Sequence, residues 1–243
     1  MVYTFDSRIR FSEAGEDGKL STQALINYLQ DCSTFQTQQG PADIAFMKER
    51  NVAWVLNFWQ IEVKRLPRLC EEVVIGTVPY ELKGMFGLRN FFMDTKDGER
   101  LAVANSIWTL FDFEKKVPAR VMPEMIETYP TGDKLSMDYA DRKIAMPSEG
   151  DRREYEEITV RTYHLDTNDH VNNGQYVRMA KECLPDKNMN ITSMRAEYRM
   201  QARLGDTIYP VVVTNRQSDR KVYTISLNNP EGKPYCLVEF KTR

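Results

Sequence analysis

Helical spacing of hydrophobic residues appears first near the start of the chain. Leu25, Ile26 and Leu29 fall on one face of a helix predicted over Ser21–Thr34. The serine that opens this segment is a suitable N-cap, because its hydroxyl can accept a hydrogen bond from an N–H group of the first turn. A short strand, Arg8–Phe11, is predicted before the helix.

The same order of elements recurs in the second half of the chain. A helix is predicted over Asn172–Leu184, with Tyr176, Val177 and Ala180 at the matching places and a proline directly after its end. A short strand, Ile158–Tyr163, is predicted before this helix.

Alternation of apolar and polar residues with period two follows each helix and predicts strands. The predicted strands are Trp54–Lys64, Glu72–Pro79, Leu88–Asp94 and Leu101–Asp112 in the first half, and Met194–Met200, Thr207–Thr214, Val222–Leu227 and Tyr235–Lys241 in the second. One long helix followed by an antiparallel meander favours a sheet wrapped around that helix, because each element then buries its apolar face. The predicted fold class is therefore α+β.

The two halves also correspond residue by residue. Arg10 matches Arg161 at an offset of 151 positions, and this offset holds through the first helix of each half. Further along, Ile61–Leu69 matches Ala196–Leu204 at an offset of 135. The shared order of elements is the stronger signal, and it indicates an internal duplication.

This duplication predicts the domain organisation. Residues 1–112 form the first domain and residues 156–243 the second. Residues 113–155 carry four prolines and many charges, so we expect a linker with at most short helical turns.

Composition limits the function classes. Hydrophobic residues make up 42% and charged residues 28% of the 243 positions, which fits folded domains, and the net charge of −2 gives no indication of nucleic-acid binding. No apolar run approaches the roughly 20 residues that a membrane span needs. Met1–Asp6 do not begin an apolar signal segment, so we expect a cytoplasmic protein.

Cysteine and histidine are sparse. The only histidines are His164 and His170, and no cluster has metal-ligand spacing, so neither a metal nor another cofactor is expected. We expect His164 to pack or cap at the end of a strand. The cysteines are expected to be free thiols, with the last two in the core: Cys32, Cys70, Cys183 and Cys236.

The segment Asp166–Asn173 carries the most promising chemistry. Asp166, Asn168 and His170 alternate in a polar loop that enters the second helix, where side chains can converge near unpaired N–H groups. Such N–H groups can stabilise an oxyanion, and histidine can exchange protons near neutral pH. Polar residues before a helix are also common caps, and a lone histidine is more often structural than catalytic.

The first half of the chain argues for a functional site in the second. Gly15, Asp17 and Lys19 occupy the positions that correspond to Asp166, Asn168 and His170. A duplicated scaffold that kept this set in one half only is typical of a protein in which one domain catalyses and the other binds.

Several short strings carry a family resemblance. The string Asp-x-Asn-x-His-Val-Asn-Asn at Asp166–Asn173 is accompanied by matches along the whole chain: Leu25–Leu29, Val52–Leu56, Gly84-Met85, Arg89, Asp97-Gly98, Ser106–Trp108, Ala196–Arg199 and Leu204–Asp206. In these strings the sequence resembles the acyl-acyl carrier protein (acyl-ACP) thioesterases of plants and bacteria.

The resemblance implies a double, or tandem, hotdog fold. In that family the first hotdog binds the acyl chain, and the second hydrolyses the thioester to a free fatty acid and ACP, which terminates fatty acid synthesis. Carried over, Asp166, Asn168 and His170 become catalytic residues. The implied partner is ACP with its phosphopantetheine-linked acyl chain.

The sequence departs from the family at two positions. The family places a carboxylate and often a cysteine shortly after its Glu-Tyr-Arg string, and the corresponding residues here are Gln201 and Ala202. A cysteine nucleophile is therefore disfavoured. Gln201 can orient a water or a carbonyl group, but a neutral amide cannot accept the water's proton.

We therefore predict direct hydrolysis by water. His170 or Asp166 activates the water, and Asn168 and Gln201 position it. The backbone N–H groups near Val171, Asn172 and Asn173 are predicted to stabilise the oxyanion, which makes these three the expected substrate-binding residues.

Two other functions stay open: an acyl-CoA thioesterase, and a non-catalytic acyl-binding hotdog protein that Gln201 would suit. A hotdog dehydratase is third, but the pairing of a histidine with a carboxylate that it requires is not seen in the sequence. Unpaired sheet edges also leave a homodimer open. Five basic residues of the second half are either a docking surface for the acidic carrier or a solvated face: Arg178, Lys181, Arg195, Arg199 and Arg203.

Overall fold

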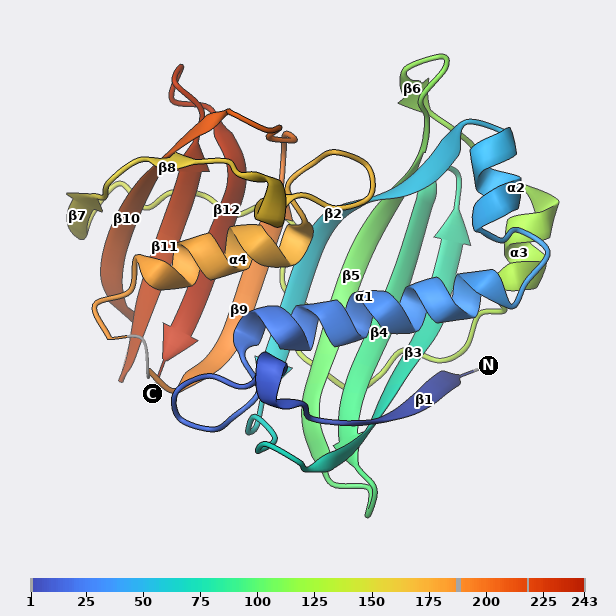
Figure 1. Cartoon of the computed structure of the whole chain (residues 1–243), viewed down its shortest axis with the longest axis horizontal. Coiled ribbons are helices and arrows are strands. Elements are labelled where there is room, and N and C mark those ends of the chain that lie inside the picture. Colours follow the sequence, from blue (N-terminus) through green and yellow to red (C-terminus); the bar gives the residue numbers. More distant parts are fainter. Residues whose placement is uncertain (1, 187–188, 218, 243) are drawn as a thin grey trace. The chain divides into compact units, whose positions relative to one another are not determined.

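The computed structural model describes residues 2–186, 189–217 and 219–242. The chain folds as two compact units, residues 1–140 and 141–243, and each is described by itself. The predicted linker, 113–155, is therefore divided between them. In each unit a long helix lies against one face of an antiparallel sheet, as predicted (Figure 1). No helix of the described residues is long and apolar enough to cross a membrane.

The sheet of the first unit has the strand order β1-β3-β4-β5-β2, and the short β6 pairs with β5. The strands are β1 (Tyr3–Arg8), β2 (Val52–Val63), β3 (Glu72–Lys83), β4 (Phe86–Thr95), β5 (Arg100–Asp112) and β6 (Val117–Pro118). The predicted Asp97-Gly98 turn joins β4 to β5, and Gly98 has a φ of 85°, which glycine adopts without strain.

Helix α1 (Thr22–Gln38) confirms the first predicted helix and extends beyond it. The Ser21 hydroxyl caps it by accepting a hydrogen bond from the Ala24 N–H at 3.2 Å. Leu25, Ile26 and Leu29 are buried, as their spacing predicted.

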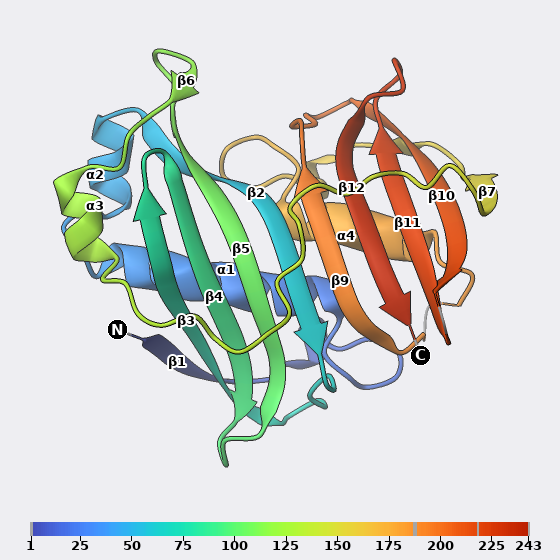
Figure 2. The same ribbon diagram turned by 180° about the vertical axis from the view of Figure 1, so that it is seen from behind.

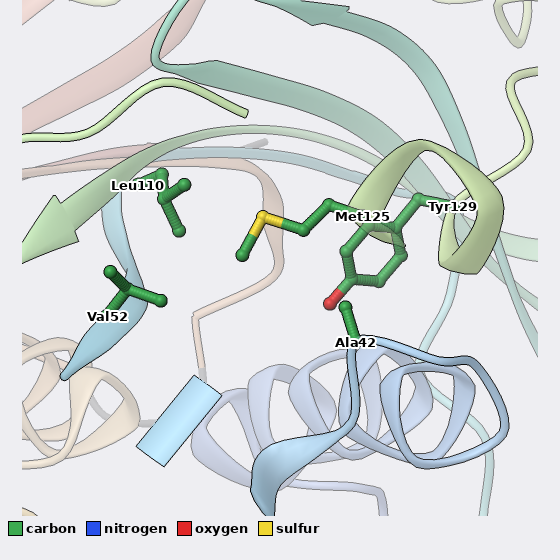
Figure 3. Close-up of a cluster of buried hydrophobic side chains, with 5 residues drawn as sticks. All are labelled: Ala42, Val52, Leu110, Met125 and Tyr129. Atoms are coloured by element: carbon green, nitrogen blue, oxygen red, sulfur yellow. The ribbon is translucent and has the colours of Figure 1, made fainter. Parts of the chain in front are cut away.

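Two short helices cover one end of this core. Helix α2 (Ile44–Glu49) follows α1, and α3 (Pro123–Thr128) lies within the predicted linker. Figure 3 shows Met125 of α3 pointing between Val52 and Leu110, with the following Tyr129 directed at Ala42. This part of the linker is therefore an element of the first core.

The sheet of the second unit has the strand order β9-β12-β11-β10-β7, with the short β8 also paired to β10. Its elements are β7 (Asp151–Glu154), β8 (Ile158–Thr159), α4 (Asn173–Glu182), β9 (Ile191–Tyr198), β10 (Thr207–Gln217), β11 (Arg220–Asn228) and β12 (Pro234–Thr242). Tyr176, Val177 and Ala180 of α4 are buried, as predicted.

In each unit, part of the segment 130–150 crosses the face of the sheet that lies opposite the long helix (Figure 2). In the first unit the Asn90 Oδ1 atom accepts the Leu135 N–H, and the Gln60 Oε1 atom accepts the Ala140 N–H at 2.8 Å. In the second unit the Glu197 carboxylate accepts the Ile144 N–H at 2.8 Å. Polar side chains are buried on these sheet faces because they form hydrogen bonds with the segment 130–150, called the strap below.

Of the two short strands predicted before the long helices, the second begins where predicted but is shorter (β8, Ile158–Thr159), and the first is misplaced. Phe11–Glu13 and Thr162–His164 form single 3-10 turns, and the strand of the first unit is Tyr3–Arg8 instead of Arg8–Phe11. Likewise the predicted linker contains β7, which pairs with β10. Short edge strands are set by pairing partners that local periodicity does not reveal.

Candidate active site

The predicted site residues occupy a tight loop that is closed by backbone hydrogen bonds. The Asp166 N–H donates to the His170 carbonyl at 2.8 Å, and Leu165 and Val171 form a β-bridge. The Asp169 N–H donates to the Asp166 carbonyl at 3.2 Å, and Asp169 adopts a left-handed φ of 59°. The loop is thus a small hairpin that delivers His170 to the start of α4.

Asp166 shapes this loop with its side chain. Its Oδ1 atom accepts the Asn168 N–H at 2.8 Å and the His170 N–H at 3.4 Å. A carboxylate that accepts backbone N–H groups holds a turn, as aspartate commonly does. Asp166 therefore acts as a positioning residue for Asn168 and His170, and this role accounts for one of its two oxygens.

A backbone hydrogen bond joins the loop to the segment that carries Gln201. The Val171 N–H donates to the Ala202 carbonyl at 3.0 Å, and the Ala202 N–H donates to the Tyr176 hydroxyl at 2.8 Å. Ala202 is fully buried, whereas Gln201 is exposed. The structure therefore brings together the two segments that the resemblance assigns to one site.

The predicted oxyanion donors need correction. The Val171 N–H is occupied by Ala202, and the Asn172 N–H donates to the His164 carbonyl at 2.9 Å. Asn172 instead acts as the N-cap of α4, since its Oδ1 atom accepts the Gly174 N–H at 2.8 Å. Two of the three backbone N–H groups expected to stabilise the oxyanion thus already donate within the protein, because they attach the loop to adjacent segments. The third substrate-binding residue, Asn173, opens α4, and its carbonyl accepts the Tyr198 hydroxyl at 3.0 Å.

The polar side chains of the loop differ in exposure. Asn168 is exposed, as is Gln201, whereas His170 is half-buried. Amide and imidazole groups at this level of exposure can reach a substrate and a water. The buried backbone holds the positions from which these side chains extend. The loop and the segment joined to it can therefore present one proton acceptor and two amide groups to a thioester.

The cysteines of this unit do not suit a nucleophilic role. Burial raises the pKa of Cys183 to about 11 and holds the pKa of Cys236 well above its usual range. Both stay protonated at neutral pH, and a thiol is a poor nucleophile. Each is buried, as predicted from the sequence.

His164 both packs and caps, the two roles expected from the sequence. It is buried, and its Nδ1 atom accepts the Arg161 N–H at 3.0 Å, which requires that nitrogen to be unprotonated. Burial, followed by the charges of Arg178 and Arg161, lowers the pKa of His164. The neutral imidazole of His164 thus holds the start of the loop.

Four of the five basic residues named in the sequence are divided between the two faces of the sheet. Arg195 donates to the carbonyls of Asp141 and Lys143, and Arg199 donates to the Ile144 carbonyl, so both hold the strap. Arg178 and Lys181 belong to α4, on the opposite face of the sheet (Figures 1 and 2).

Comparison with known proteins identifies the family. The N-terminal domain of acyl-ACP thioesterases matches residues 1–129, and the C-terminal domain of acyl-ACP thioesterases matches residues 148–241. The chain belongs to the acyl-ACP thioesterase family. An acyl-ACP hydrolase of Cuphea viscosissima, named FATB2 and chloroplastic, is 27% identical over 83% of the chain, which covers 52% of that protein. The chain thus spans about half the length of the curated acyl-ACP thioesterases it matches.

Solved structures of acyl-ACP thioesterases and their relatives confirm the tandem hotdog fold. A chain from Lactobacillus plantarum, provisionally described as an oleoyl thioesterase, matches with a TM-score of 0.90 at 21% identity and covers 100% of this chain and 96% of that one. The 12:0-ACP thioesterase of Umbellularia californica matches with a TM-score of 0.85 at 22% identity, over 100% and 94% of the two chains.

Proposed function

We propose that this protein hydrolyses fatty acyl-ACP to a free fatty acid and ACP. Membership of the acyl-ACP thioesterase family across both domains supports this activity. The observation that carries the proposal is the hydrogen bond from the Val171 N–H to the Ala202 carbonyl, because it joins the His170 loop to the segment of Gln201. A cytoplasmic location and a homodimer stay predictions.

The reaction begins with attack of water on the carbonyl carbon of the thioester. His170 accepts the proton of the attacking water as the C–O bond forms. The side-chain amides of Asn168 and Gln201 orient the water and the carbonyl oxygen. The tetrahedral intermediate then expels the phosphopantetheine sulfur, which takes the proton back from His170, while Asp166 keeps the loop in shape.

Release of carrier thiol tests this proposal. The purified protein is incubated with dodecanoyl-ACP, and free thiol and free dodecanoic acid are measured as functions of substrate concentration. We expect both products in equal amounts. Saturable binding of the acyl carrier without product would contradict hydrolysis and favour an acyl-binding protein. Dodecanoyl-CoA in a parallel assay measures the preference for the carrier as a ratio of kcat/KM.

Gln201 tests the assignment of the base. If His170 takes the proton, Gln201→Glu changes kcat by less than about threefold, because a second base adds little to one that already works. Gln201→Ala serves as the control and lowers kcat by removing an orienting amide. An increase of tenfold or more in Gln201→Glu would mean that the glutamine limits catalysis and that a carboxylate is the better base.

A further inference from the structure

The first unit contains a buried cation without a counter-charge. Arg89 of β4 is only 7% exposed, and its Nη1 atom has no hydrogen-bond partner among the described residues. Its nearest interactions are with aromatic faces: its guanidinium carbon lies 5.1 Å from the Tyr129 ring centroid and 5.8 Å from that of Phe91. Burial lowers the pKa of Arg89. Burying a charge without a hydrogen-bonded partner is costly, so this arrangement needs an explanation.

Other arginines of the same unit show the ordinary arrangement. Arg65 bridges Glu71 and Glu99 at the surface, and Arg100 binds Asp94. The more a charge is buried, the more it depends on a partner, yet Arg89 has the least exposure and no carboxylate beside it among the described residues.

Four other buried polar atoms of this unit have no hydrogen-bond partner among the described residues, and two of them concern the surroundings of Arg89. The Gln36 Oε1 atom on α1 and the Trp59 Nε1 atom on β2 are buried without partners among the described residues. The Trp59 ring contacts Phe91 at a centroid distance of 4.9 Å. Gln36 precedes Thr37, whose hydroxyl shares a 2.9 Å hydrogen bond with the Tyr129 hydroxyl. The Phe91 ring therefore lies close to both Trp59 and Arg89, and Tyr129 joins Arg89 to the last turn of α1, which carries Gln36.

We propose that Arg89, Trp59 and Gln36 form a binding site for an oxygen atom carried on the acyl chain of the substrate. This inference rests on the proposed function and names its substrate class: acyl chains with a hydroxyl or carboxylate group, in preference to plain hydrocarbon chains. Arg89 and Trp59 donate to that oxygen, and Gln36 accepts from a hydroxyl. A ligand oxygen supplies the hydrogen bond that the buried guanidinium lacks. A site built for such a group rejects an analogue that leaves its polar atoms unpaired.

Equilibrium binding of free fatty acids tests the site without requiring turnover. Calorimetry compares dodecanoic acid, dodecanedioic acid and a set of hydroxydodecanoic acids with the hydroxyl at successive carbons. We expect at least one oxygenated acid to bind the wild type about tenfold or more tightly than dodecanoic acid. In Arg89→Met that preference disappears, while the affinity for dodecanoic acid changes by less than about threefold. If dodecanoic acid binds as tightly as every oxygenated acid, or if Arg89→Met keeps the preference, the inference is wrong.

The two ligand classes are separated by Gln36→Leu. This variant loses the preference for a hydroxyl, which donates to Gln36, and keeps the preference for a carboxylate, which does not. It also replaces Arg89→Met as the test if that variant fails to fold. An unchanged hydroxyl preference in Gln36→Leu, together with no carboxylate preference in the wild type, would overturn the site.

Stability and hydrolysis provide independent readouts. Without ligand, Arg89→Met is expected to melt at a higher temperature than the wild type, because an unpaired buried cation is removed. A lower melting temperature would assign Arg89 a structural role and contradict the site. Hydrolysis of plain dodecanoyl-ACP with no preference for its oxygenated analogues would overturn this inference and leave the proposed function intact. Preferential binding of oxygenated acids without hydrolysis of any thioester would support the site and overturn the proposed function.

Discussion

The loops 10–21 and 161–172 have the same backbone and different chemistry. In the first unit the Gly15 N–H donates to the Lys19 carbonyl at 2.8 Å, as the Asp166 N–H donates to the His170 carbonyl at 2.8 Å in the second. Residues at the turn match too, since Gly18 has a φ of 69° and Asp169 a φ of 59°.

The attachment of the two loops is also equivalent. The Leu20 N–H donates to the Pro67 carbonyl at 2.8 Å, in the place of the bond between Val171 and Ala202. The Ser21 N–H donates to the Glu13 carbonyl at 2.9 Å, in the place of the bond between Asn172 and His164. The backbone hydrogen bonds of the loop therefore do not depend on the histidine. The first loop is a natural control in which the scaffold is present and the histidine is absent.

Exchanging the residue that distinguishes the loops gives the largest expected effect. His170→Lys places the first loop's residue in the second and should lower kcat for acyl-ACP hydrolysis by about 100- to 10,000-fold, because the proton acceptor is lost. Lys19→His, the matched variant, should leave kcat unchanged. The fold should survive in both, as measured by circular dichroism. A His170→Lys variant with near-normal turnover would remove His170 from the mechanism.

The second comparison concerns how the loops are anchored. In the second unit the Ala202 N–H donates to the Tyr176 hydroxyl. The corresponding residues of the first unit are Pro67, which has no N–H, and Leu25, which has no hydroxyl. Tyr176→Phe leaves the Ala202 N–H buried without a partner and should lower the free energy of unfolding by about 1–3 kcal/mol.

A double-mutant cycle isolates this anchor. In an Ala202→Pro background the N–H is gone, so Tyr176→Phe should cost little more, and chemical denaturation measures both steps. Equal losses from Tyr176→Phe in the two backgrounds would show that the hydroxyl does not act through Ala202.

A third difference makes the second loop sensitive to pH. Glu13 accepts the Arg10 N–H at 2.8 Å in the first unit, and His164 accepts the Arg161 N–H in the second. The pKa of His164 is lowered in the folded protein, chiefly by burial, so the folded state binds this proton less readily than the unfolded state. The contribution of His164 to the free energy of unfolding is therefore complete above its pKa in the unfolded state, about 6.5. This contribution is lost as the pH falls through the lower pKa of the folded state.

Thermal unfolding between pH 7.5 and 5 measures this loss. His164→Gln keeps an acceptor and cannot titrate, so its stability should decline less over that range. A parallel decline in the variant and the wild type would assign the pH dependence to other groups.

The turn residues give the smallest expected effect. Asp169 holds a left-handed conformation that glycine adopts without strain at Gly18. Asp169→Gly relieves that strain, but glycine also makes the unfolded chain more flexible. The net effect should be an increase of about 0.5 kcal/mol in the free energy of unfolding. Gly18→Asp should show the opposite sign in the same denaturation assay. A loss of stability in Asp169→Gly would mean that the aspartate side chain contributes to the loop.

Local patterns predicted much of the fold because they depend on residues close in the sequence. Ser21 as an N-cap and the buried face of α1 follow from helical spacing, and the long strands follow from alternation. The edge strand Tyr3–Arg8 and the helix Pro123–Thr128 were missed, since each is stabilised by partners far along the chain. The loop residues Asp166, Asn168 and His170 were found because they form one continuous string; their catalytic roles stay predictions.

By itself the sequence determined the internal duplication, the order of elements and the family, because repeated residues and periodic burial are properties of the string of amino acids. Only the tertiary structure decided how the polar atoms are used. It showed that the amides of Val171 and Asn172 are already bonded, and that Arg89 is buried without a counter-charge. A hydrogen bond or an ion pair requires two groups to meet within a few ångströms, and segments distant in the sequence meet only when the chain is folded.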